Sequence, residues 1–122
     1  MNAKILLVDD SALARRTTRQ ILEAAGYVVV EAEDGMTALE RYFLEKPDVV
    51  LLDLVMKGMM GLDVLAKLHE LDPKVRAIVV SADIQDSSRE MAAAGGARSF
   101  LNKPIDRASL LSAVSGVLEA PA

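Results

Sequence analysis

Residues 49–55 read VVLLDLV, an aliphatic run that holds a single carboxylate, Asp53. The run is short, continuous and rich in β-branched residues, which is typical of a strand buried on both faces of a parallel sheet. Because an uncompensated charge is costly inside such a sheet, we expect Asp53 where the strand ends and reaches solvent. Residues 5–11, ILLVDDS, form a second run of this kind, which ends on two acids, Asp9 and Asp10.

Aliphatic runs and amphipathic segments alternate five times along the chain. The predicted strands are Ile5–Val8, Val28–Val30, Val49–Leu52, Ala77–Val80 and the shorter Phe100–Leu101. The residues that mark the intervening helices are Leu13, Thr17, Ile21 and Ala24; Ala38, Leu39, Tyr42 and Phe43; Leu62, Leu65, Leu68 and Leu71; the segment 87–94; and Leu110, Leu111, Val114, Val117 and Leu118. This (βα)5 pattern predicts an α/β fold with one parallel sheet and helices on both faces.

Two of the predicted helices carry further expectations. On the first, Arg15, Arg16 and Arg19 are most simply a solvated face, although they flank the expected site and could meet an acidic partner. The fourth is expected to begin after an N-cap at Asp86 or Ser87 and to bury mostly alanines together with Met91.

Length and composition narrow the function. A chain of 122 residues fits one domain over 1–122, and the absence of cysteine excludes disulfides, thiolate metal sites and cysteine nucleophiles. The net charge is −4 and the basic residues form no block, which argues against nucleic-acid binding by this chain alone. No apolar stretch approaches the ~18 residues that span a membrane, and no signal-peptide pattern is present, which favours the cytoplasm.

Polar side chains follow four of the five predicted strands: Asp9 and Asp10, Asp53, Ser81, and Lys103. Ligands of open α/β sheets bind beyond the carboxyl ends of the strands, so these five residues are expected to gather at one rim. Each has an ordinary reading on its own, such as a helix N-cap for Asp10 or a solvated side chain for Lys103. Their joint occurrence at one end of the sheet is what indicates a functional site.

The combination of these groups suits phosphoryl transfer. Two carboxylates ~4 Å apart repel by roughly 4 kcal/mol at an effective dielectric constant near 20, so a lysine and a divalent metal are expected to join them. Asp53 is the best candidate for a nucleophile that forms an aspartyl phosphate, while Asp9 and Asp10 hold the metal. Lys103 and a hydroxyl would then stabilise the charge on the phosphoryl oxygens.

Five motifs in this order resemble the receiver domain of two-component response regulators, and the resemblance spans essentially the whole chain. They are LLVDDS at 6–11, EDGMTAL at 33–39, PDVVLLDLVM at 47–56, VVSA at 79–82 and NKP at 102–104. The resemblance implies a flavodoxin-like fold with strand order 2-1-3-4-5. It also implies a chemotaxis-type single-domain receiver.

The resemblance assigns roles to the acids. Asp53 looks like the phosphoacceptor, which takes a phosphoryl group from a histidine kinase or a phosphotransfer protein. Asp9, Asp10 and Asp53 look like ligands of Mg²⁺, with Mn²⁺ as an alternative, and the backbone carbonyl of Val55 is a further ligand.

The resemblance also assigns roles around the acceptor. Lys103 would bind a phosphoryl oxygen, and its bond to Pro104 is typically cis in the family. Ser81 would move to donate a hydrogen bond to the phosphoryl group, and Phe100 occupies the place of the aromatic that turns inward with it. Because Phe100 has no hydroxyl, its rotamer preference is expected to be weaker than that of a tyrosine.

The loop after the acceptor departs from the family pattern. Lys57 stands where the family usually has proline, and it adds a cation near the site. Val55 and Asp83 occupy positions where side chains often tune dephosphorylation.

The resulting prediction is a stand-alone receiver that changes its surface for a downstream target protein, as a monomer or a weak phosphorylation-dependent dimer. It is a switch rather than a turnover enzyme. Three alternatives stay open: a receiver cut from a longer regulator with a DNA-binding or enzymatic output domain, a small aspartyl-phosphate hydrolase of the haloacid-dehalogenase kind, and a pseudo-receiver that binds partners without phosphate.

Overall fold

A computed structural model describes residues 2–56, 58–82 and 86–120 and confirms the predicted fold class. Five parallel strands form one sheet in the order β2-β1-β3-β4-β5. The strands are β1 (Lys4–Val8), β2 (Val28–Ala32), β3 (Val49–Asp53), β4 (Ala77–Ser81) and β5 (Ser99–Asn102). The helices are α1 (Ala12–Ala24), α2 (Gly35–Glu45), α3 (Gly61–Leu71), α4 (Asp86–Ala94) and α5 (Arg107–Glu119).

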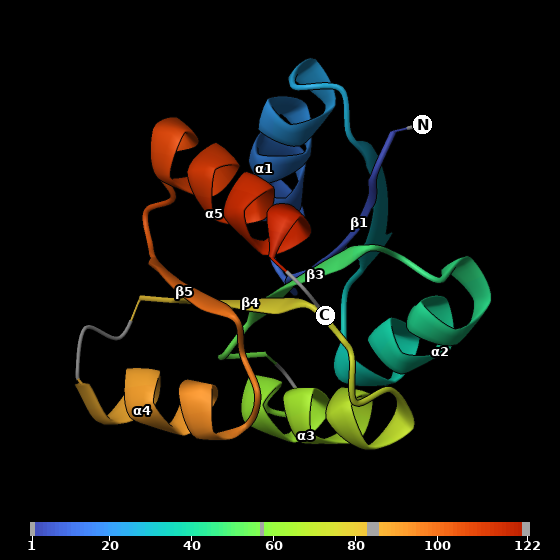
Figure 1. The fold of residues 1–122 in the computed structure, drawn as a ribbon, viewed down its shortest axis with the longest axis vertical. Coiled ribbons are helices and arrows are strands. Elements are labelled where there is room, and N and C mark those ends of the chain that lie inside the picture. The colour runs from blue at the N-terminus through green and yellow to red at the C-terminus, as the bar shows by residue number, and fades with distance from the viewer. Residues whose placement is uncertain (1, 57, 83–85, 121–122) are drawn as a thin grey trace.

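Helices cover both faces of the sheet (Figure 1). α1 and α5 pack on one face, where Leu22, Leu110 and Val114 meet inward-facing residues of the strands. α2, α3 and α4 cover the other face through a second core cluster. All five residues of β3 and of β4 are buried, which explains why these strands read as continuous aliphatic runs rather than alternating ones. Within the described ranges, no helix is long and apolar enough to cross a membrane.

Three helices begin with a side-chain cap. The side chains of Ser11, Asp34 and Asp106 accept hydrogen bonds from the backbone amides of Ala14, Thr37 and Ser109. A cap of this kind contributes about 1 kcal/mol to stability. Because Ser11 directly follows the two acids at the end of β1, its cap also determines where the acidic turn stops and α1 starts.

The buried face of α1 differs from the predicted one. Leu13 is 73% exposed, whereas Thr18 and Leu22 are buried. The helical spacing of apolar residues fits either of two adjacent faces in this segment, and the structure uses the face of Thr18 and Leu22. The solvated face predicted for the arginines is also wrong for Arg15, whose side chain is 14% exposed and pairs with Glu31 of β2. Arg19 pairs with the same acid, but its side chain remains 40% exposed.

Smaller corrections concern three other helices. Phe43 on α2 and Leu71 on α3 are exposed rather than buried, as is Met91 on α4. α4 begins at Asp86, so this residue belongs to the helix and does not precede it as an N-cap. The alanine prediction holds at Ala92, which is 1% exposed.

Candidate functional site

The sheet order brings the two acidic turns together. β1 and β3 are neighbours, with Val8 paired to Leu52, so Asp9 and Asp53 end adjacent strands at the same edge. One carboxylate oxygen from each of Asp9, Asp10 and Asp53 lies within 4.8 Å of the others. Asp9 and Asp53 are each 6% exposed, while Asp10 faces solvent. The site is therefore a cluster of three acids that opens to water on the side of Asp10.

Each buried carboxylate uses one oxygen to order its own turn. The backbone amide of Ser11 donates to Oδ1 of Asp9 at 2.9 Å, and that of Val55 donates to Oδ1 of Asp53 at 3.2 Å. The other oxygens share one cation: Nζ of Lys103 lies 3.1 Å from Oδ2 of Asp9 and 3.0 Å from Oδ2 of Asp53. Lys103, which directly follows β5, therefore links the acids at the ends of β1 and β3.

The electrostatics of Asp53 differ from those of an ordinary surface acid. Burial raises the pKa of Asp53, and the hydrogen bond from Lys103 offsets this only in part. The nearby charge of Asp9 adds to the rise in the pKa of Asp53. Burial alone would lower the pKa of Lys103, but its hydrogen bonds to Asp53 and Asp9 outweigh that cost and raise it. The site therefore favours the charged form of Lys103 and disfavours the charged form of Asp53.

Lys103 is positioned by its backbone. Its amide donates to the carbonyl of Ser81 at 2.9 Å, and Ser81 pairs with Asn102 in the β4–β5 register. The following bond, to Pro104, is cis. Ser81 is fully buried at the end of β4, so the hydroxyl lies beneath the rim rather than on it.

α3 approaches the acceptor strand closely at Gly61. A Cβ on Gly61 would lie 2.6 Å from Cα of Leu54, and its amide donates to the carbonyl of Leu54 at 2.9 Å. Any side chain at this position would push α3 away from the end of β3. The sequence predicted Gly61 only as the start of a helix, and its GLDVL context carries no stronger signal of this contact.

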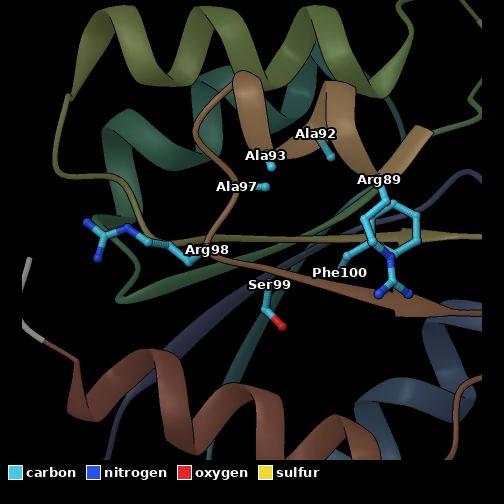
Figure 2. Close-up of a pocket in the computed structure, with 7 residues that line it drawn as sticks. All are labelled: Arg89, Ala92, Ala93, Ala97, Arg98, Ser99 and Phe100. Atoms are coloured by element: carbon cyan, nitrogen blue, oxygen red, sulfur yellow. The ribbon is translucent and has the colours of Figure 1, made fainter. Parts of the chain in front are cut away.

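Phe100 lies outside the acid cluster, on β5 beneath α4. The guanidinium carbon of Arg89 is 5.1 Å from the centroid of the Phe100 ring, which is a cation–π contact (Figure 2). The two residues border a cavity of about 310 Å³ that Ala92, Ala93 and Ala97 also line. The structure therefore records Phe100 with Arg89 above its ring.

Three tuning positions have different outcomes. Val55 is exposed beside Asp53, and its amide contacts the carboxylate as described above. Lys57 and Asp83 lie outside the described residues.

Arg15 is a residue of the site region that the sequence reasoning missed. Its NH1 group donates to the backbone carbonyl of Asp9 at 2.5 Å, and its side chain is only 14% exposed. The sequence feature that could have indicated this role is the pair of arginines one turn apart, Arg15 and Arg19. In the structure both pair with Glu31 of β2.

The donor set fits a hard divalent cation. Three carboxylates against one ammonium leave a net charge of −2, and the exposed carboxylate of Asp10 leaves room for water ligands. Mg²⁺ binds through one or two carboxylates while keeping several waters, which agrees with this arrangement.

Comparisons with known proteins agree with this geometry. A family model described as the response regulator receiver domain matches residues 5–115. The chain is 36% identical to the chemotaxis protein CheY of Thermotoga maritima, over 96% of this chain and 98% of that protein. It is 34% identical to sporulation initiation phosphotransferase F of Bacillus subtilis, over 97% of this chain and 95% of that protein.

Solved structures give the same result. A chain of the CheX–CheY–BeF3–Mg²⁺ complex from Borrelia burgdorferi superposes with a TM-score of 0.92 at 31% identity, covering 97% of this chain and 90% of that one. A CheY-like receiver domain protein from Methanospirillum hungatei gives a TM-score of 0.92 at 28% identity, covering 98% of this chain and 95% of that one.

Proposed function

The chain belongs to the response regulator receiver family, and on that premise we propose that it is a phosphorylation-dependent signalling switch whose phosphoacceptor is Asp53. The single observation that carries this proposal is the shared cation: Lys103 contacts both Asp53 and Asp9, and of these two acids only Asp53 is itself the last residue of its strand, the central β3. Burial raises the pKa of Asp53, and acids with raised pKa values cluster at functional sites.

In the proposed reaction, a carboxylate oxygen of Asp53 attacks the phosphorus of a phosphohistidine on a kinase or phosphotransfer protein. An O–P bond forms, the P–N bond breaks, and the imidazole nitrogen leaves with the electron pair and takes up a proton. Lys103 lies within 3.0 Å of Asp53 and would pair with a phosphoryl oxygen as its charge develops. Ser81 and Phe100 would then carry the change to the surface, and the cis bond before Pro104 sets the course of the chain after Lys103.

Asp9, Asp10 and Asp53, together with the carbonyl of Val55, would hold Mg²⁺, with Mn²⁺ as an alternative. When bound, the ion supplies positive charge that offsets the excess of negative charge at the site. The protein's own contribution is to hold two carboxylates in fixed turns through the amides of Ser11 and Val55.

The proposal includes the protein's place in signalling. The chain would act in the cytoplasm, and its receiver domain over 1–122 would pass its state to a target protein rather than turn over a substrate. Its match to nearly the whole length of CheY of Thermotoga maritima supports a receiver of the chemotaxis type. The side chain of Val55 cannot position water, so it would not assist loss of the phosphoryl group.

The test is phosphorylation by acetyl phosphate in the presence of Mg²⁺. One phosphoryl group, an increase of about 80 Da, is expected on the parent protein, and peptide mapping should place it at Asp53. Asp53→Asn should abolish the increase, whereas Asp48→Asn, which changes an exposed acid just before the same strand, should leave it intact.

Two results would contradict the proposal. The first is an unmodified parent protein under conditions where Mg²⁺ binding is demonstrated. The second is steady turnover of a small phosphomonoester that survives Asp53→Asn, which would favour a hydrolase instead.

A further inference from the structure

Arg15 connects three parts of the molecule. It stands on the first turn of α1, its NH1 group donates to the carbonyl of Asp9 at the end of β1, and its Nε pairs with Glu31 of β2 at 2.9 Å. Glu31 also pairs with Arg19 through its second oxygen, at 2.5 Å. Both oxygens of Glu31 are therefore occupied by arginines, and Arg15 is fixed at two points.

These contacts complete the hydrogen bonding of the acidic turn. The amide of Asp9 donates to Ala32 of β2, its carbonyl accepts from Arg15, and its carboxylate accepts from the amide of Ser11. Ser11 is held in turn as the N-cap of α1. Arg15 reaches the peptide group between Asp9 and Asp10 from outside the turn, through the carbonyl of Asp9.

That peptide group determines how the two acids stand relative to each other. Asp10 follows directly, and its carboxylate lies with those of Asp9 and Asp53 within 4.8 Å. Like charges this close repel, so the turn would rotate Asp10 away unless its backbone were restrained. A guanidinium fork fixed by Glu31 supplies such a restraint, because its donors have a rigid geometry.

We propose that Arg15 is a positioning residue for the divalent cation site, and that Glu31 positions Arg15. The inference rests on the proposed function, since it concerns the same three acids. Arg15 acts through the Asp9 carbonyl and contributes no ligand. By holding the turn, Arg15 strengthens cation binding, whereas its positive charge alone would weaken it.

The opposite signs make the proposal testable. A positive charge near the site repels a cation. If Coulomb interactions alone mattered, removing the charge of Arg15 would therefore tighten Mg²⁺ binding. Loss of positioning would weaken binding instead, by about 10-fold, as is typical when the residue that orients a ligand is removed. The measurement is the Kd of Mg²⁺, obtained by NMR from the changes in the backbone amide chemical shifts of Asp10 and Val55 as MgCl₂ is added.

Arg15→Ala is expected to bind Mg²⁺ about 10-fold more weakly than the parent. Arg16→Ala is the matched control, because Arg16 is the next residue on the same helix turn and is exposed to solvent. It should bind Mg²⁺ as tightly as the parent or more tightly. Arg15→Lys keeps the charge but loses the fork, and it should also bind more weakly than the parent.

Glu31→Gln tests the second half of the proposal. It should weaken Mg²⁺ binding in the parent but have little further effect in Arg15→Ala, because the residue that it holds is gone. If Arg15→Ala does not fold, Arg15→Lys decides the question, because it keeps the charge, whereas removal of the Glu31 charge would weaken cation binding by Coulomb effects as well.

Unchanged or tighter Mg²⁺ binding in folded Arg15→Ala or Arg15→Lys would overturn the positioning role. If the parent itself neither binds Mg²⁺ nor is phosphorylated at Asp53, the proposed function fails instead, so the two failures are distinguishable.

Discussion

The two ends of the sheet hold their acids in opposite ways. At the carboxyl end, Asp53 is buried beside a second acid, and burial raises its pKa. At the other end, where α3 runs back toward β4, Asp72 accepts a hydrogen bond of 2.7 Å from the hydroxyl of Tyr42 on α2. That bond, with one from the amide of Lys74, lowers the pKa of Asp72, while burial and the neighbouring carboxylate raise the pKa of Tyr42.

The difference separates an acid whose charged form the fold favours, Asp72, from an acid whose charged form it disfavours, Asp53. The fold favours the charged form of Asp72 relative to the unfolded chain, so Asp72 stabilises the structure at neutral pH. It disfavours the charged form of Asp53, and Lys103 limits that cost without removing it. Local structure therefore shifts the pKa values of two aspartates, Asp53 and Asp72, in opposite directions.

The largest expected effect comes from removing the cation at the carboxyl end. Lys103→Ala leaves two buried carboxylates without their shared partner, and we expect a loss of about 3 kcal/mol in the free energy of unfolding without Mg²⁺. Mg²⁺ should recover part of that loss, because it replaces the missing charge. Urea denaturation with and without MgCl₂ measures both quantities.

Lys4→Ala provides the comparison from the opposite end. Lys4 pairs with Glu45 at 3.2 Å in a partly exposed bridge, so its loss should cost less than about 1 kcal/mol and show no dependence on Mg²⁺. Equal losses for the two lysines would remove the distinction between the ends of the sheet.

A smaller effect is expected for Tyr42→Phe, about 1 kcal/mol at neutral pH, because Asp72 loses a hydrogen bond to its charged form. The lowered pKa of Asp72 means that this contribution is present above its unfolded pKa of about 3.9 and is lost as the pH falls through the folded value. Urea midpoints measured across this range should converge for parent and variant at low pH. Tyr27→Phe, which removes a hydroxyl that has no hydrogen-bond partner among the described residues, should show no such convergence. A pH-independent difference for Tyr42→Phe would contradict the assignment.

The smallest effect is a gain. Because burial raises the pKa of Asp53, the fold disfavours its charged form, and Lys103 keeps Asp9 as a partner when Asp53 is neutral; Asp53→Asn should therefore gain up to about 1 kcal/mol at pH 7. The raised pKa of Asp53 means that its contribution to stability is complete below the unfolded pKa and is lost as the pH rises through the folded one. The advantage of the variant should therefore disappear in acid, in contrast to Tyr42→Phe. A variant less stable than the parent at pH 7 would place Asp53 with the structural acids.

Much of the fold and of the acid cluster could be predicted from the sequence. Aliphatic runs such as Val49–Leu52 can be identified as strands because both faces of the strand are buried. Acids that follow parallel strands lie at the same end of the sheet, so their proximity could be predicted as well. The buried face of α1 could not be predicted, because the spacing of its less polar residues fits both the face of Leu13 and the face of Thr18 and Leu22. The structure uses the face that also brings Arg15 to Glu31.

Arg15 illustrates why part of the site was missed. An arginine on an amphipathic helix is usually solvated, and nothing local to its sequence shows that Glu31 lies beside it. The contact depends on β1 and β2 being neighbours, with Leu7 paired to Glu31. Such a relation exists only in the folded sheet.

The ion pairs of Glu31 have a consequence for association between chains. β2 is an outer strand of the sheet, and its sequence VVVEA would be a template for strand addition by another molecule if it were wholly apolar. Glu31 places a charged group in that strand, and its arginines tie it to α1. Removing the carboxylate should therefore lower resistance to aggregation at high protein concentration, in addition to its effect on the acidic turn.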